Sequence, residues 1–218
     1  MAKVARNYMN FYEAYFSFSQ GDILGSRVEG NSKSAYGACH AFSLHWLRLI
    51  LTSVSRQLAP AQRMAELNKN KGGSNPLLQY TLDMRYEPEE LMVFDQMLMR
   101  LRGLKYTKKV PIRYTPYCFI TLFNQLSWEE GAYFYGFWYR QYPGAQQVYG
   151  HAMAFYRTKS TAGHSGFIIV YDSNLGEFYV LPSKFLSFWL GHAASYGCIE
   201  HHILRSVEID GKDSVDGY

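Results

Sequence analysis

Apolar residues recur at helical spacing over 38–51, where steps of three and four positions join most of them. They are Cys39, Ala41, Phe42, Leu44, Trp46, Leu47, Leu49 and Ile50. Together they cover most of the circumference of a helix, which is typical of a buried one. Further helical patterns predict helices over 61–68, 87–101 and 115–126, so we expect the first 126 residues to be mainly helical.

The hydrophobic pattern changes to that of β-strands after residue 126. Aromatic and β-branched residues predict strands over 131–140, 150–157, 166–172, 177–181 and 198–209. The turn S-N-L-G between the third and the fourth strand predicts a hairpin, and an apolar stripe predicts one late helix over 184–195. A helical half followed by an antiparallel sheet is an α+β arrangement.

We expect one domain over residues 1–218, because the chain has no internal repeat and no low-complexity linker. Its expected parts are an N-terminal extension (1–36), a helical part (37–126), a sheet part (127–209) and a frayed tail (210–218). Apolar residues make up 48% of the chain and aromatic residues 17%, which is ample for a packed core.

The net charge of +4 is mild, and Lys and Arg are scattered along the chain. Their densest cluster, at 105–113, forms neither a basic stripe nor a known nucleic-acid module, so we expect no nucleic-acid partner. No apolar run reaches the ~20 residues that span a bilayer. Residues 1–10 lack the apolar core of a signal peptide. We therefore expect neither an integral membrane segment nor a signal peptide.

Three cysteines, Cys39, Cys118 and Cys198, lie far apart and form no C-x-x-C pair. An odd and dispersed set indicates reduced thiols and not a disulfide framework. No His/Cys spacing matches a zinc site, and the adjacent His201 and His202 point to opposite faces of their strand. We expect no metal and no cofactor, and we interpret Cys118 and Cys198 as packing residues.

Cys39 lies where the long helix is expected to begin, after the small residues Gly37 and Ala38. Unpaired amide groups and the dipole at a helix N-terminus favour a thiolate, and small neighbours leave room for a substrate. A small buried residue on an apolar helix is the competing interpretation, because free cysteine is among the most buried residue types.

His151 opens one predicted strand and Asp172 closes the next, with the loop 158–165 between the two strands. If these strands pair as antiparallel neighbours, His151 and Asp172 meet at one end of the sheet. A carboxylate that holds one ring nitrogen of a histidine leaves the other nitrogen free to take a thiol proton. With Cys39 facing that end of the sheet, the three residues form a nucleophile, a base and an orienting acid.

The aromatic run Y-F-Y-G-F-W-Y-R-Q-Y over 133–142 has two interpretations. One is a core strand with a tyrosine-rich outer face, which the strand preference of aromatic residues favours. The other is a wall that faces a substrate.

Three motifs carry a resemblance to a known family. They are G-A-C-H-A-F-S-L-H-W-L around Cys39, G-H-A-M-A around His151 and D-S-N-L-G-E-F around Asp172. With them the chain resembles the YopT/AvrPphB-type cysteine peptidases, bacterial effectors with a papain-like core, over 37–50 and 131–196. The resemblance implies a papain-like α+β fold in which the nucleophile helix packs on the C-terminal antiparallel sheet. It also implies Cys39 as nucleophile, His151 as general base and acid, and Asp172 as the residue that orients His151.

Two places depart from the family pattern. Family members often have proline directly after the aspartate, where this chain has Ser173. Papain-like enzymes place an amide side chain five or six residues before the cysteine to donate to the oxyanion, and this chain has Lys33 and Ser34 there. The backbone N–H of Cys39 and either Asn31 or Ser34 are the expected oxyanion donors.

The resemblance implies a cysteine protease that cleaves a protein substrate through an acyl-enzyme, in a bacterial effector or toxin. The same triad also suits a glutamine deamidase or a transglutaminase, and a catalytically inactive protein-binding module is the non-enzymatic alternative. By the same resemblance, a bacterium secretes the protein into the reducing cytosol of a host or rival cell. The short N-terminus leaves little room for a secretion segment, which suggests a secretion chaperone or carrier.

Overall fold

The computed structural model describes the residues that form a central sheet and the helices packed on it. The described residues are 14–17, 39–56, 59–69, 96–107, 112–114, 124–126, 129–160, 162 and 166–211. Asn31, Ser34 and Cys118 lie outside them, as do most of the N-terminal extension and the residues after 211. The division into an extension, a helical part, a sheet part and a tail stays a prediction.

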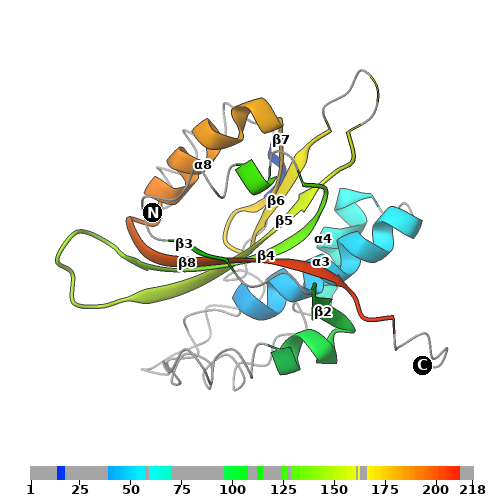
Figure 1. The fold of residues 1–218 in the computed structure, drawn as a ribbon, viewed down its shortest axis with the longest axis horizontal. Coiled ribbons are helices and arrows are strands. Elements are labelled where there is room, and N and C mark those ends of the chain that lie inside the picture. The colour runs from blue at the N-terminus through cyan, green and yellow to red at the C-terminus, as the bar shows by residue number, and fades with distance from the viewer. Residues whose placement is uncertain are drawn as a thin grey trace.

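The described strands form one antiparallel sheet of eight (Figure 1). They are β1 (Ala14–Ser17), β2 (Leu104–Tyr106), β3 (Ile112–Tyr114), β4 (Gly131–Arg140), β5 (Tyr149–Arg157), β6 (Ile168–Asp172), β7 (Gly176–Val180) and β8 (Cys198–Ile209). The order across the sheet is β1-β7-β6-β5-β4-β8-β2, and β3 pairs with a second stretch of β8. The four strands from β4 to β7 are neighbours in chain order.

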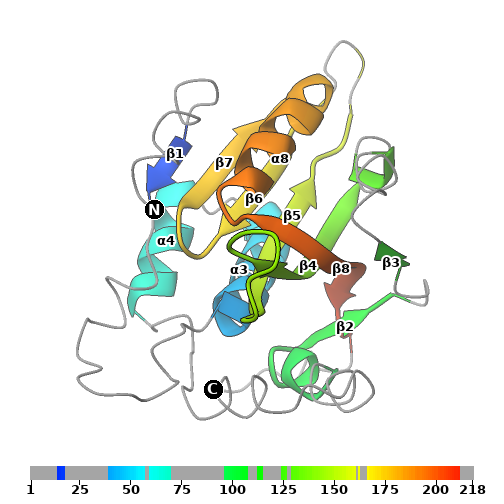
Figure 2. The same ribbon diagram turned by 90° about the vertical axis from the view of Figure 1, so that its left-hand side faces the viewer.

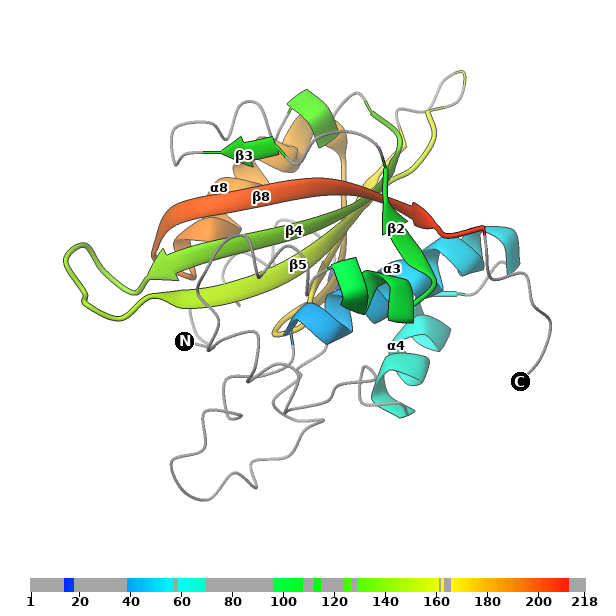
Figure 3. The same cartoon turned by 60° about the horizontal axis from the view of Figure 1, so that its bottom comes forward.

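Helices cover both faces of this sheet. α3 (Cys39–Arg56) packs on one face and α8 (Phe185–Ala194) on the other, as Figure 2 shows. A short 3-10 helix, η4 (Pro182–Lys184), leads into α8. α4 (Pro60–Lys69) lies beside α3 (Figure 3). The sheet is therefore the middle layer of three.

The alternation of side chains along the strands divides the apolar residues into two cores. On β4, Ala132 and Phe134 belong to the core under α3. Tyr133, Tyr135 and Phe137 belong to the core under α8. Because successive side chains of a strand point to opposite faces, a run that is continuously aromatic in the sequence supplies both cores.

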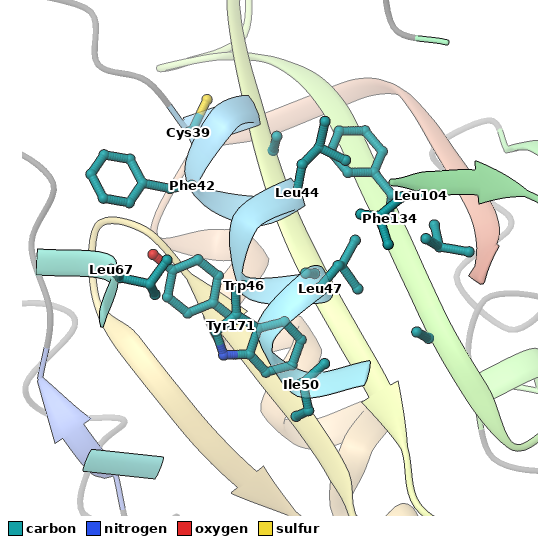
Figure 4. Packing of buried hydrophobic residues seen from close by; sticks show 14 of the residues in the cluster. Cys39, Phe42, Leu44, Trp46, Leu47, Ile50, Leu67, Leu104, Phe134 and Tyr171 are labelled. Carbon is teal, nitrogen blue, oxygen red and sulfur yellow. The ribbon is translucent and has the colours of Figure 1, made fainter. Parts of the chain in front are cut away.

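Small residues on β5 let α3 approach the sheet closely. Ala152 and Ala154 are buried under α3, and Ser43 of α3 donates a hydrogen bond to the carbonyl oxygen of Ala152 at 3.0 Å. Trp46 stacks on Tyr171 of β6 with ring centroids 5.4 Å apart (Figure 4). A hydrogen bond and a stacked ring pair therefore fix where α3 sits on the sheet, in addition to apolar burial.

The elements expected after residue 126 are confirmed, and β8 has the bounds that the sequence predicts. The α+β class and the packing of the helix that begins at Cys39 on the antiparallel sheet are confirmed too. The helix expected over 61–68 is α4. Of the helices expected over 87–101 and 115–126, the described residues 96–101 and 124–126 are helical.

The described residues before 127 are mainly helical, as expected, but the short strands β1, β2 and β3 also lie there. The sequence analysis did not predict β2 and β3. Each is a three-residue strand paired with β8. A strand of that length carries no readable alternation, and it forms here because β8 offers the edge on which it can pair. In the described part of the chain, no helix is long and apolar enough to cross a bilayer.

A buried ion pair joins α4 to the sheet beside α3. Glu177 of β7 is fully buried, and its carboxylate accepts hydrogen bonds from Arg63 Nη2 and from Trp46 Nε1, each at 2.6 Å. Arg63 also donates to the hydroxyl of Tyr179 at 3.1 Å. Burial lowers the pKa of Arg63, but its hydrogen bond and charge interaction with Glu177 outweigh burial and raise that pKa. Arg63 therefore stays protonated inside the protein.

We predict that Arg63→Met lowers the free energy of unfolding by about 3–5 kcal/mol, because Glu177 is then buried without its cation. Urea denaturation followed by tryptophan fluorescence measures the loss. Lys105→Ala is the matched control, since it removes an ion pair with Glu208 whose side chains are 45% and 53% exposed. The control variant should lower the free energy of unfolding by about 1 kcal/mol or less. Equal losses in the two variants would contradict a stabilising role for the buried pair.

Candidate active site

Cys39 is the first residue of α3. The residue is 6% exposed, and Figure 4 shows the sulfur pointing away from the apolar side chains packed under the helix. The first turn of a helix has amide groups without partners inside the helix. The expected position of Cys39 at the start of a long buried helix is confirmed.

β5 and β6 bring His151 and Asp172 together. The two strands pair antiparallel with Met153 opposite Asp172, so His151, two residues earlier on β5, lies on the same face of the sheet as Asp172. His151 Nε2 and Asp172 Oδ1 are 3.1 Å apart, and both side chains are buried. The expected pairing of these strands, with His151 beside Asp172, is confirmed.

The imidazole of His151 interacts with both Asp172 and Cys39. Its Nε2 faces Asp172, and Cys39 lies close enough to contribute to the raised pKa of His151. Burial lowers the pKa of His151, but the charge and hydrogen bond of Asp172, followed by those of Cys39, outweigh burial and raise that pKa to about 10. The ring is therefore positively charged at neutral pH. An adjacent imidazolium at a helix N-terminus is an environment in which cysteine reacts as a thiolate.

The carboxylate of Asp172 is ionised although it is fully buried. Burial raises the pKa of a carboxyl group, but the charge and hydrogen bond of His151, followed by those of His192, hold the pKa of Asp172 well below its usual range. The backbone N–H of Asn174 also donates to Asp172 Oδ1 at 2.8 Å, within the turn that joins β6 to β7. The turn expected at S-N-L-G therefore helps to hold the carboxylate of Asp172 in place.

Two residues that contact Asp172, His192 and Tyr196, are missed by the sequence analysis. His192 Nε2 lies 2.8 Å from Asp172 Oδ2, and the Tyr196 hydroxyl donates to the same oxygen at 2.5 Å. Their one sequence signal is a separation of four positions, which can place two side chains on one face of a helix. The packing of α8 on the face to which Asp172 points brings them into the site.

The aromatic run of β4 continues to the site. Tyr139 is half-buried, stacks on Tyr149 with centroids 5.5 Å apart, and packs edge-on against Tyr196. Burial, followed by the charge of Cys39, raises the pKa of Tyr139 to about 12, so this hydroxyl lies within electrostatic reach of the thiol. The run therefore supplies core residues on both faces and ends near Cys39.

Two adjacent histidines on β8 were considered as metal ligands. His201 is exposed and His202 is buried, with Nδ1 2.9 Å from the Tyr135 hydroxyl, so these neighbours point to opposite faces as expected. No three His, Cys, Asp or Glu side chains among the described residues are placed to hold a metal ion.

Asn31 and Ser34 lie outside the described residues, so the second oxyanion donor stays a prediction.

Comparison with solved structures identifies the fold. The chain is similar to the crystal structure of the Pseudomonas avirulence protein AvrPphB, with a TM-score of 0.55 and 17% identity. That match covers 79% of this chain and 92% of AvrPphB. The fold expected from the three motifs, that of the YopT/AvrPphB-type peptidases, is therefore confirmed as a fold.

A second solved structure matches more distantly. It is PatoxP, a cysteine protease-like domain of the Photorhabdus asymbiotica toxin PaTox, with a TM-score of 0.45 and 14% identity. The match covers 93% of this chain and 57% of that one. No sequence-family model and no curated protein sequence matches the chain.

The raised pKa of His151 predicts how the stability of the protein depends on pH. The folded pKa is about 10 and the ordinary value is about 6.5, so the protonated ring stabilises the fold fully below about pH 6.5. That contribution is lost as the pH rises through 10. The difference in unfolding free energy between the wild type and His151→Ala should therefore shrink steadily between these pH values, as measured by urea denaturation.

Nuclear magnetic resonance of the histidine Cε1 protons tests the same assignment directly. The signal of His151, assigned by its loss in His151→Ala, should not titrate until the pH is well above 8. Asp172→Asn removes the negative charge that raises the pKa of His151 most, so this variant should lower that pKa. A wild-type ring that titrates at its ordinary value would contradict the ion pair.

Proposed function

We propose that this chain is a cysteine peptidase in which Cys39 is the nucleophile, His151 the general base and acid, and Asp172 the residue that orients His151. One observation carries the proposal: His151 Nε2 lies 3.1 Å from Asp172, and Cys39, the first residue of α3, is close enough to contribute to the raised pKa of His151. A nucleophile within reach of a base, which an acid in turn holds, is the arrangement that covalent acyl transfer requires. The fold shared with AvrPphB supports the proposal.

In the proposed reaction, His151 Nδ1 holds the proton of the Cys39 thiol, and the thiolate sulfur attacks a peptide carbonyl carbon. The oxyanion that forms is stabilised by the backbone N–H of Cys39. His151 then donates the proton to the leaving amine as the C–N bond breaks, which leaves an acyl group on the sulfur. Water, deprotonated by His151, attacks this thioester, and the carboxylic acid product departs as the thiolate is restored.

The proposed substrate is a protein, and the proposed setting is a bacterial effector that acts in the cytosol of another cell. Both rest on the resemblance of the three motifs and on the shared fold. Free cysteines are compatible with a reducing compartment. A secretion chaperone or carrier belongs to the same proposal.

We expect Cys39 to react with iodoacetamide far faster than Cys198, which lies half-buried on β8 and serves as an internal reference. Mass spectrometry of peptides measures both rates over about pH 5–9, the range in which an ordinary thiol loses its thiolate form. His151→Ala should slow the reaction of Cys39 by about 100-fold at the acidic end. Equal rates at the two cysteines would overturn the assignment of Cys39 as nucleophile.

The reaction type is tested with cell lysates incubated with the wild type or with Cys39→Ala. New protein N-termini that appear with the wild type alone identify a peptidase, because a peptide C–N bond must break to create them. Conversion of glutamine to glutamate without new N-termini would replace the peptidase with a deamidase. If wild type and Cys39→Ala have the same effect on a target, the protein acts by binding and the catalytic proposal fails.

A further inference from the structure

The carboxylate of Asp172 has more partners than the orientation of one histidine needs. Oδ1 lies 3.1 Å from His151 Nε2 and accepts a hydrogen bond from the N–H of Asn174 at 2.8 Å. Oδ2 lies 2.8 Å from His192 Nε2 and accepts a hydrogen bond from the Tyr196 hydroxyl at 2.5 Å. An ionised carboxylate has about four lone-pair positions, so this one is saturated.

The division of these partners between the two oxygens fixes the rotation of the carboxylate. A turn of the carboxylate away from His151 would break the contacts of Oδ2 with His192 and Tyr196. Both residues come from a single segment, the last turn of α8 and the residues after it. Additional hydrogen bonds hold this segment, including those from the backbone N–H and the hydroxyl of Ser195 to the carbonyl oxygen of His192.

Tyr196 also restrains the ring of His151 itself. The two rings are stacked with centroids 4.8 Å apart at 27°, and the phenol oxygen lies 3.0 Å from His151 Nε2. Phe137 packs on the imidazole edge-on at 5.4 Å. A half-turn of the imidazole about its Cβ–Cγ bond would put Cε1 where Nε2 now faces Asp172 and would break that contact. The stack and the phenol contact both oppose that rotation.

We propose that His192 and Tyr196 are positioning residues that lock Asp172 and the imidazole of His151, so that Nδ1 stays directed at the sulfur of Cys39. The proposal rests on the function proposed above and adds a second histidine and a tyrosine to its site. Neither residue takes part in bond making. The titratable groups that face His151 are Cys39 from α3, Asp172 from β6 and Tyr196 after α8, with His192 acting through the carboxylate.

The test compares variants of the full chain in two measurements: the NMR titration of His151 and the iodoacetamide reaction of Cys39. His192→Leu removes one donor to Asp172, and Tyr196→Phe removes the hydroxyl while keeping the stacked ring. Each should lower the pKa of His151 and slow alkylation of Cys39 at neutral pH by about tenfold, as expected for loss of a hydrogen bond to a charged group. His192→Gln keeps an N–H donor at this position and should restore most of the rate.

A control separates positioning from the stability of α8. Phe185→Leu perturbs the same helix, where Phe185 packs on Phe155 and Trp189 away from the carboxylate. It should lower the free energy of unfolding and leave the titration of His151 and the reactivity of Cys39 unchanged. If it changes them as much as His192→Leu does, α8 acts by packing alone and the proposal is overturned.

Two further outcomes are decisive. Folded His192→Leu and Tyr196→Phe variants that titrate and react like the wild type would overturn the positioning role. If Cys39 is unreactive even in the wild type, while His192→Leu still lowers the pKa of His151, the peptidase proposal fails and the restraint on His151 stands. The titration needs no substrate and no reactive thiol, so the two proposals fail separately.

Discussion

The burial of one ionised carboxylate, that of Asp172, constrains the whole end of the molecule that holds the candidate site. A charge fully removed from water is tolerated when it is paired and hydrogen-bonded. β5 supplies His151, the β6–β7 turn supplies the N–H of Asn174, and α8 with the residues after it supplies His192 and Tyr196. Each of these elements must be in place before the carboxylate is satisfied, so the fold and the site are completed together.

The β6–β7 hairpin connects this carboxylate to the other face of the sheet. Asp172 points toward α8, whereas the preceding residue, Tyr171, points toward α3 and stacks on Trp46. Glu177 lies opposite Tyr171 and binds Trp46 and Arg63 on that same face. Two buried carboxylates, one on each face, therefore hold a single hairpin between α3 and α8. The position of Cys39 relative to His151 depends on both.

A direct hydrogen bond also holds α3 on β5, the strand that carries His151. Ser43, one helical turn after Cys39, donates to the carbonyl oxygen of Ala152, the residue that follows His151. A shift of α3 along the sheet would break this hydrogen bond together with the Trp46–Tyr171 stack. Precise placement of a nucleophile against its base depends on such contacts, because side chains are held only as firmly as the elements that carry them.

Much of the fold and three residues of the site are predictable from local patterns in the sequence. Apolar residues around the whole circumference indicate the buried helix of Cys39, and alternation with turn residues indicates the strands from 131 to 209. Antiparallel pairing of two consecutive strands then brings His151 to Asp172, since a short loop leaves few other arrangements. Each of these inferences uses residues close together in the chain, for which spacing is a sufficient guide.

The sequence by itself therefore determined the types of the elements after residue 126 and of α3 and α4, the pairing of His151 with Asp172, and the start of the helix of Cys39. The tertiary structure alone decided the rest: the strand conformation of 104–106 and 112–114 on the edge of β8, and the approach of His192 and Tyr196 to Asp172. It also decided the meeting of Arg63 with Glu177. These features join residues from distant parts of the chain, and the requirement that selects them is that a buried charge or a strand edge find a partner. That requirement exists only after the chain has folded, so no local spacing records it.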